Sequence, residues 1–133
     1  MRMQYYDCHT HVHFAAFNDD MDAVIGRAKE ADVGMITVGT QYETSEAAVR
    51  VAEAHDHVWA AIGLHPTHTD KSFHDVKELG EDGAEFTQHG EVFDPARYEK
   101  LARSSKVVAI GECGLDYFRL EEHTKKRQEE KTI

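Results

Sequence analysis

Two histidines close the first apolar segment of the chain, within residues 7–11, DCHTH. Because alternate residues of an extended strand face the same side, His9 and His11 can direct both imidazoles at one metal ion. The alternative is coincidence, since the chain holds 10 histidines. His13 continues the alternation, but it follows the apolar segment, and we expect it on the surface of a loop.

A carboxylate follows another apolar segment. Glu112 comes directly after residues 107–111, VVAIG. A carboxylate at the end of a buried strand costs free energy unless it binds a cation or several donors. The position therefore predicts a metal ligand or a general base, with a capping role in a turn as the alternative. The run 111–117, GECGLDY, adds Asp116 and Tyr117 in the same turn.

A third histidine follows a third apolar segment. His65 lies in residues 63–66, GLHP, and the proline favours an extended, rigid backbone before it. That geometry would hold the imidazole at the edge of a sheet. A role of His65 in the site and a purely structural role are equally weighted alternatives.

The segments that must position these side chains are expected to be strands. Three of them are near-continuous apolar runs that end in glycine, and such runs are typical of parallel strands covered on both faces. The expected strands are residues 4–8, 34–39, 58–64 and 106–112.

Helical patterns lie between the strands. Residues 19–31 and 45–55 carry apolar side chains at helical spacing, and Asp94 with Pro95 is a start signal for a third helix that continues through Ala102. Alternating strands and helices predict an α/β fold, with right-handed connections and a parallel sheet in chain order.

Length and composition indicate one domain and argue against some kinds of partner and location. The chain has 133 residues, 41% of them hydrophobic, and a formal charge of -10, which argues against a basic groove for nucleic acid. It contains no apolar run long enough for a membrane span and no signal sequence, so we expect a cytoplasmic protein. Cys8 and Cys113 are expected to be free thiols, and Cys113 should point away from Glu112.

Two segments fit no strand or helix of the core. Residues 67–93 are polar and interrupt the strand spacing, so they are expected to form a surface insertion or a mobile loop beside the open edge of the sheet. Residues 120–133 have almost no apolar stripe, and either a fourth helix or a frayed end fits them.

The motifs together resemble one known family. Asp7-x-His9-x-His11, residues 63–66 and the run 111–117 are similar to the TatD family of metal-dependent deoxyribonucleases. The run GECGLDY is the specific element, because a bare His-x-His also occurs in other metal hydrolases. The resemblance covers the chain from Tyr6 to about residue 119, apart from the insertion.

The resemblance implies a (β/α)8 barrel of the TIM type with two divalent metals, Zn, Mg or Mn, at the carboxyl ends of its strands. It implies that His9 and His11 bind one metal and that Glu112 bridges both. His65 would lie near the phosphate of a DNA substrate, with Asp116 and Tyr117 supporting the site.

The family usually has an acidic residue at the position of His13, and it completes its site with residues from later strands. Because a (β/α)8 barrel takes ~250 residues, we expect this chain to be one partial domain, the first half of the barrel with about four βα units. Three ligands cannot normally fix two ions, so we expect little activity from it alone.

Two alternatives to a nuclease remain. One is a half-barrel that pairs with another copy or another chain, because exposed apolar strands at 58–64 and 106–112 would drive association. The other is a module that binds metal without turnover.

Overall fold

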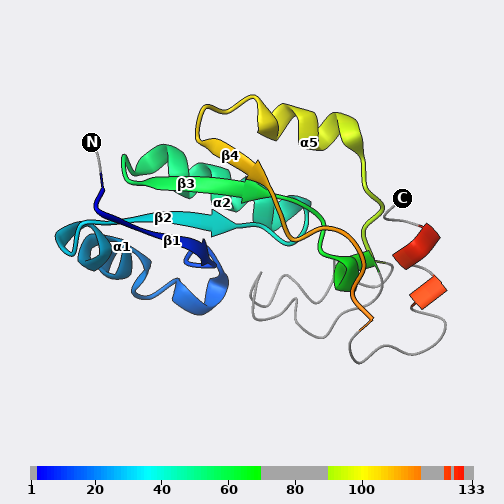
Figure 1. Ribbon diagram of the computed structural model, residues 1–133, viewed down its shortest axis with the longest axis horizontal. Helices are drawn as coiled ribbons and strands as arrows, with labels where there is room; N and C mark the ends of the chain where they lie inside the picture. The colour runs from blue at the N-terminus through cyan, green and yellow to red at the C-terminus, as the bar shows by residue number, and fades with distance from the viewer. Residues whose placement is uncertain (1–2, 70–89, 118–124, 127, 131–133) are drawn as a thin grey trace.

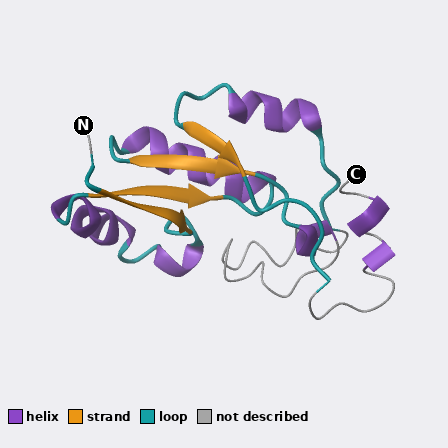
Figure 2. Cartoon of the chain, in the orientation of Figure 1, coloured by secondary structure: helices purple, strands orange, loops and turns teal. Residues whose placement is uncertain are grey.

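The computed structural model describes residues 3–69, 90–117, 125–126 and 128–130. Within them, strands and helices alternate along the chain (Figures 1 and 2). The elements are β1 (Tyr5–Thr10), α1 (Met21–Glu30), β2 (Val33–Val38), α2 (Tyr42–Ala54), β3 (Val58–Ile62), α5 (Pro95–Ala102) and β4 (Val107–Ile110), with 3-10 turns η1 (Ala15–Phe17) and η2 (Pro66–Thr69).

The four strands form one parallel sheet in the order β1-β2-β3-β4. All four arrows in Figure 1 point the same way, so the carboxyl ends of the strands share one edge. The α/β class and the strand order predicted from the sequence are confirmed. Parallel neighbours in chain order with a helix in each connection are the arrangement of successive βα units in a TIM-type barrel.

The apolar core lies between the sheet and the helices. On β3, the alternate residues Val58, Ala60 and Ile62 are fully buried in it, and α2 packs on β3 and β2. The opposite face of the sheet carries the rings of Tyr6 and Trp59, whose centroids lie 5.6 Å apart. The helices therefore cover one face, as a portion of a barrel requires.

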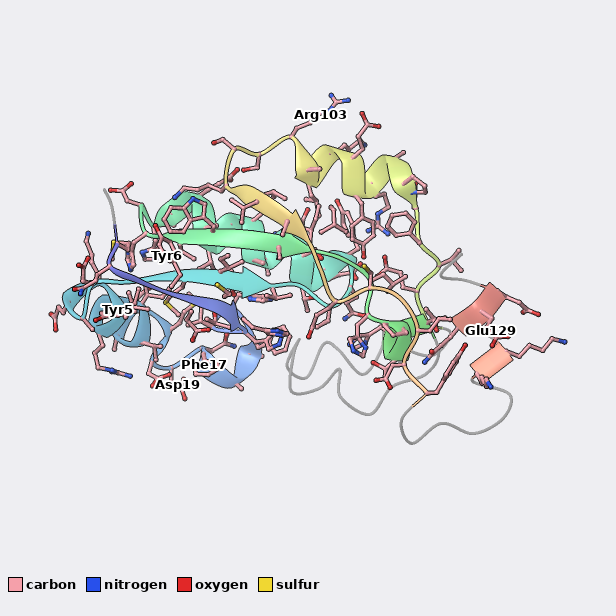
Figure 3. The ribbon with its side chains drawn as sticks, viewed as in Figure 1. Tyr5, Tyr6, Phe17, Asp19, Arg103 and Glu129 are labelled. Carbon is pink, nitrogen blue, oxygen red and sulfur yellow. The ribbon has the colours of Figure 1, made fainter. Side chains whose placement is uncertain are left out.

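Four exposed apolar side chains lie on the two edge strands of the sheet. Tyr5 and Tyr6 on β1, labelled in Figure 3, are 59% and 49% exposed. Val108 and Ile110 on β4 are 52% and 66% exposed. The expectation that residues 58–64 would also be exposed is wrong, because β3 is paired on both sides and covered by α2.

Local capping sets where the helices begin. α2 begins at Tyr42, three residues before the predicted start, because Gln41 and Thr44 form a reciprocal capping box. α5 begins as predicted, since the Asp94 carboxylate accepts a hydrogen bond from the amide of Ala96 at 2.9 Å and Pro95 opens the first turn.

The polar insertion lies mostly outside the described residues, which omit 70–89. Its first described end is buried, whereas residues 92–93 at its second described end are exposed. Pro66, His68 and Thr69 are buried in η2, and the amide of Glu91 donates to the carbonyl of His68 at 2.8 Å. Most of residues 120–133 also lie outside the described part. Among the described helices, none has the length and hydrophobicity to cross a lipid bilayer.

Candidate metal centre

Three side chains from opposite edges of the sheet meet at its carboxyl end. Nε2 of His9 lies 3.2 Å from Nε2 of His11 and 2.8 Å from Oε1 of Glu112, and Nε2 of His11 lies 3.9 Å from the same oxygen. In the described part of the chain, they are the one group of metal-binding side chains whose ligand atoms gather this closely.

The ring of His11 is oriented by two neighbours. Its Nδ1 lies 2.8 Å from the main-chain oxygen of Val38, which can only accept, so Nδ1 carries the hydrogen. Phe14 stacks on the same ring, with centroids 4.5 Å apart and planes 22° from parallel. In the neutral ring, Nε2 therefore carries the lone pair, and it faces His9 and Glu112. A backbone hydrogen-bond partner on the other ring nitrogen is common for metal-binding histidines.

His9 is fixed mainly through its backbone. Its amide donates to the carboxylate of Asp7 at 3.1 Å, which shapes the chain just before the end of β1. The side chain of His9 is 57% exposed, against 29% for His11. The cluster is thus more open to solvent on the side of His9 than on the side of His11.

Glu112 adopts an unusual backbone conformation. Its φ of 48° lies in the left-handed region, which costs a non-glycine residue of this kind roughly 1–2 kcal/mol. The amide of Gly111 donates to the carbonyl of Ile62 at 3.0 Å, so the strand pairing holds until the residue before it. Strained residues that the surroundings hold in place concentrate at functional sites.

The three ligand atoms suit a small divalent cation. In a tetrahedral site with ligands ~2.0–2.2 Å from the ion, neighbouring donors lie roughly 3.3 Å apart. The observed separations of 2.8, 3.2 and 3.9 Å lie on both sides of that value. A single hydrogen on Nε2 of His9 cannot lie on the lines to both His11 and Glu112, whereas a cation would engage all three lone pairs at once.

Comparison with known proteins identifies the family. The family model described as TatD related DNase matches residues 6–132. This chain belongs to the TatD-related DNase family.

Curated TatD relatives are similar over most of this chain. The 3'-5' ssDNA/RNA exonuclease TatD of Pantoea ananatis is 38% identical over 105 residues, which cover 77% of this chain and 34% of the relative. The uncharacterized metal-dependent hydrolase YabD of Bacillus subtilis is 34% identical over 113 residues, covering 84% and 37%. The chain therefore spans about a third of the length of the curated relatives it matches.

A solved TatD structure has the same fold. The crystal structure of YJJV, a TatD homologue from Escherichia coli K12, matches 99% of this chain and 45% of its own, with a TM-score of 0.65 and 27% identity. The match confirms the α/β fold of a partial barrel for the described βα units.

The remaining residues implied by the TatD resemblance are not part of the three-donor cluster. Nδ1 of His65 accepts from the amide of Thr67 at 3.2 Å and lies 2.7 Å from its hydroxyl. The amide of Asp116 donates to Oε1 of Gln128 at 2.9 Å. The hydroxyl of Tyr117 donates to Glu129 at 2.9 Å, and this hydrogen bond raises the pKa of Tyr117.

His13 is not on a loop surface, and that expectation is wrong. It is 9% exposed, and its Nδ1 lies 2.5 Å from the hydroxyl of the fully buried Thr37. Its ring also meets Phe14 edge-on, with centroids 4.7 Å apart. His13 thus packs beside His11, with ring centroids 6.3 Å apart, at the position where the TatD pattern usually has an acidic residue.

A second carboxylate near this edge was missed by sequence reasoning. Glu91 accepts from the amide of Tyr42 at 2.8 Å and from the hydroxyl of Tyr98 at 2.9 Å. Burial raises the pKa of the Glu91 carboxyl, while these two hydrogen bonds oppose the rise. Glu91 thus connects the end of the insertion to the first turn of α2. In the sequence, its position within a polar run is the one signal that could have indicated it.

Proposed function

We propose that this chain carries the N-terminal half of the active centre of a TatD-type hydrolase that cleaves phosphodiester bonds of DNA. The observation that carries the proposal is the meeting of His9, His11 and Glu112, from opposite edges of the sheet, with ligand atoms 2.8 to 3.9 Å apart. The cleft-like end of a parallel barrel is also where enzymes of this architecture place their chemistry.

His9, His11 and Glu112 would hold the divalent cation. Imidazole nitrogens prefer zinc over magnesium, so the pair of histidines favours Zn, and Mn and Mg would bind the same site more weakly. Two ions are expected in the complete family site, and these three side chains account for one of them. A divalent cation, when bound, polarises a phosphoryl oxygen and lowers the pKa of water.

The chain's own groups would handle the proton and the phosphate. Glu112 has a second carboxylate oxygen, which can accept a proton from an attacking water. Since Nδ1 of His65 accepts from the amide of Thr67, its Nε2 is the protonated nitrogen of the neutral ring and can donate to a phosphate oxygen. Asp116 and Tyr117 would support the substrate from the turn that follows Glu112.

The relatives support a nucleic-acid substrate. Several of them are named as exonucleases of single-stranded DNA and RNA. A chain with a formal charge of -10 repels phosphates at long range, so bound cations are the expected means of attracting DNA.

Both cysteines are exposed and free in the structure, which suits the reducing cytoplasm.

The experiment is a cleavage assay on end-labelled single-stranded DNA, with Zn, Mn or Mg and with a chelator. We expect slow, metal-dependent cleavage that Glu112→Gln abolishes. Glu46→Gln is the matched control, because Glu46 is an exposed carboxylate paired with Arg50 on α2. Cleavage that persists in the chelator or in Glu112→Gln would refute the proposal, and metal binding without cleavage would favour a binding module.

A self-associating half-barrel is the second candidate, and the exposed edge strands favour it. Tyr5, Tyr6, Val108 and Ile110 leave apolar surface at both edges of the sheet. A second copy or another chain could cover these edges and complete the centre. Light scattering tests this, since an Ile110→Lys variant should lower the mass if association uses β4, and an unchanged monomeric mass in both proteins would exclude it.

A further inference from the structure

We propose that a ladder of small residues across the strand ends sets the spacing of the metal centre. This glycine ladder consists of Gly39, Ser45, Gly63 and Gly111. It would position His11 and Glu112 relative to each other without touching metal or substrate. The inference rests on the proposed function, because it concerns how the three ligands are aligned.

The tightest step of the ladder joins β3 to β4. A Cβ atom on Gly63 would overlap the carbonyl oxygen of Gly111 and lie 2.9 Å from its carbonyl carbon. The same two segments are joined by the hydrogen bond from Gly111 to Ile62. Only a residue without a side chain allows this approach, so Gly63 determines how closely the end of β4 lies beside β3.

The constraint is not symmetric. A Cβ atom on Gly111 would meet Cβ of Ala61 at 3.6 Å and a methyl of Val38 at 3.9 Å, both ordinary contacts. Gly63 is therefore the position that must lack a side chain, because the backbone of Gly111 occupies the space where its Cβ would lie. The asymmetry separates a specific steric limit from a general preference for glycine at the ends of strands.

Ser45 joins this step to β2. Its hydroxyl accepts from the amide of Gly63 at 3.2 Å and lies 3.3 Å from the carbonyl oxygen of the same residue. A Cβ atom on Gly39 would overlap the backbone of Ser45. Ser45 is fully buried in the first turns of α2, so it fills the space between the two glycines.

Each end of the ladder is a glycine that adjoins a residue of the metal centre or a residue that orients one. Gly39 follows Val38, whose carbonyl oxygen holds Nδ1 of His11. Gly111 precedes Glu112, whose carboxylate meets His9. Any change in the ladder would thus move an orienting carbonyl relative to a ligand carboxylate, and centres of this kind tolerate errors of only about 0.5 Å.

Gly63→Ala tests the ladder, with zinc affinity measured by calorimetry and ligand geometry by the absorption of bound cobalt. We expect affinity to fall about tenfold to a hundredfold and the cobalt spectrum to change, as when groups behind metal ligands are altered. Gly111→Ala should weaken binding less than Gly63→Ala. Gly26→Ala, with open space around its Cβ in α1, should bind as the unaltered chain does.

The unfolding free energy without metal separates alignment from stability. Unchanged zinc affinity and cobalt spectrum in folded Gly63→Ala would overturn the proposal, even if the variant were less stable. If Gly63→Ala does not fold, Ser45→Ala decides, since it removes only the bridging hydroxyl. We then expect weaker zinc binding and an altered cobalt spectrum, and unaltered values would overturn the ladder.

Failure of the proposed function would look different. If the unaltered chain binds no metal, the ladder is tested by the imidazole nitrogen resonances of His11 in nuclear magnetic resonance spectra. Gly63→Ala, or Ser45→Ala if the first does not fold, should shift these resonances, and Gly26→Ala should not. Identical His11 resonances in all of these proteins would refute the ladder independently of metal.

Discussion

The carboxylate of Glu112 lies 2.8 Å from Nε2 of His9. His9 is on β1 and Glu112 follows β4, and these two strands are the opposite edges of the sheet. With neighbouring strands ~4.8 Å apart, the edges of a flat four-stranded sheet would be separated by roughly 14 Å. A sheet that curls toward the face that carries Tyr6 and Trp59 brings the two side chains within reach of each other. The same curl makes the sheet part of a barrel and closes the candidate metal centre.

The backbone of Glu112 predicts opposite effects on stability and metal binding. Glu112→Asn should raise the free energy of unfolding of the metal-free chain by about 0.5–1 kcal/mol, because asparagine adopts the left-handed region more readily. It should also weaken zinc binding. Urea unfolding and calorimetry measure the two effects.

The control for this prediction is Glu99→Asn in α5, where Glu99 pairs with Arg103 on the surface. Asparagine is a poorer helix former than glutamate, so this variant should lose a few tenths of a kcal/mol and bind zinc normally. A loss of stability in Glu112→Asn as large as that in Glu99→Asn would show that φ at residue 112 is not a source of strain.

The stacking of Phe14 on His11 predicts a selective loss of metal affinity. Phe14→Ala should weaken zinc binding by about tenfold, because the imidazole of His11 loses its support on one side. Phe17→Ala, three residues away and exposed in η1, should not change the affinity. Equal affinities in the two variants would assign Phe14 a packing role only.

Glu91 predicts a pH dependence of stability. Burial raises the pKa of its carboxyl from the ordinary 4.5, so the folded state holds the proton more tightly than the unfolded state. Folding is thus favoured at low pH by this group, and that contribution is lost as the pH rises through the raised pKa. Glu91→Gln cannot ionise and should remove the loss.

Urea unfolding of both proteins between about pH 4.5 and pH 7 measures this contribution as a difference. The stability of the unaltered chain should fall relative to Glu91→Gln as the pH rises. Parallel curves would mean that the hydrogen bonds from Tyr42 and Tyr98 fully compensate the burial of the charge.

Much of the fold could be predicted because it depends on local pattern. The apolar run expected at residues 34–39 became β2 at Val33–Val38, and the run at 106–112 became β4 at Val107–Ile110. The alternation of His9 and His11 also predicted that their rings would point the same way, and the structure places them together with Glu112.

The polar contacts around the strand ends could not be predicted, because the partners are distant in sequence. The buried ring of His13 contacts the hydroxyl of Thr37, and Glu91 receives its hydrogen bonds from the first turn of α2 and from α5. Nothing near these residues reveals such contacts. The carbonyl of Val38 that orients His11 carries no side-chain signal at all.

The central claim is that His9, His11 and Glu112 hold a divalent cation, and a calorimetric titration with Zn tests it most directly. The unaltered chain should bind one ion, and the His9→Ala, His11→Ala double variant should lose at least about tenfold in affinity. His55→Ala, which removes a partly exposed histidine beside Asp22, should bind as the unaltered chain does. Equal binding by the double variant and the unaltered chain would contradict the account.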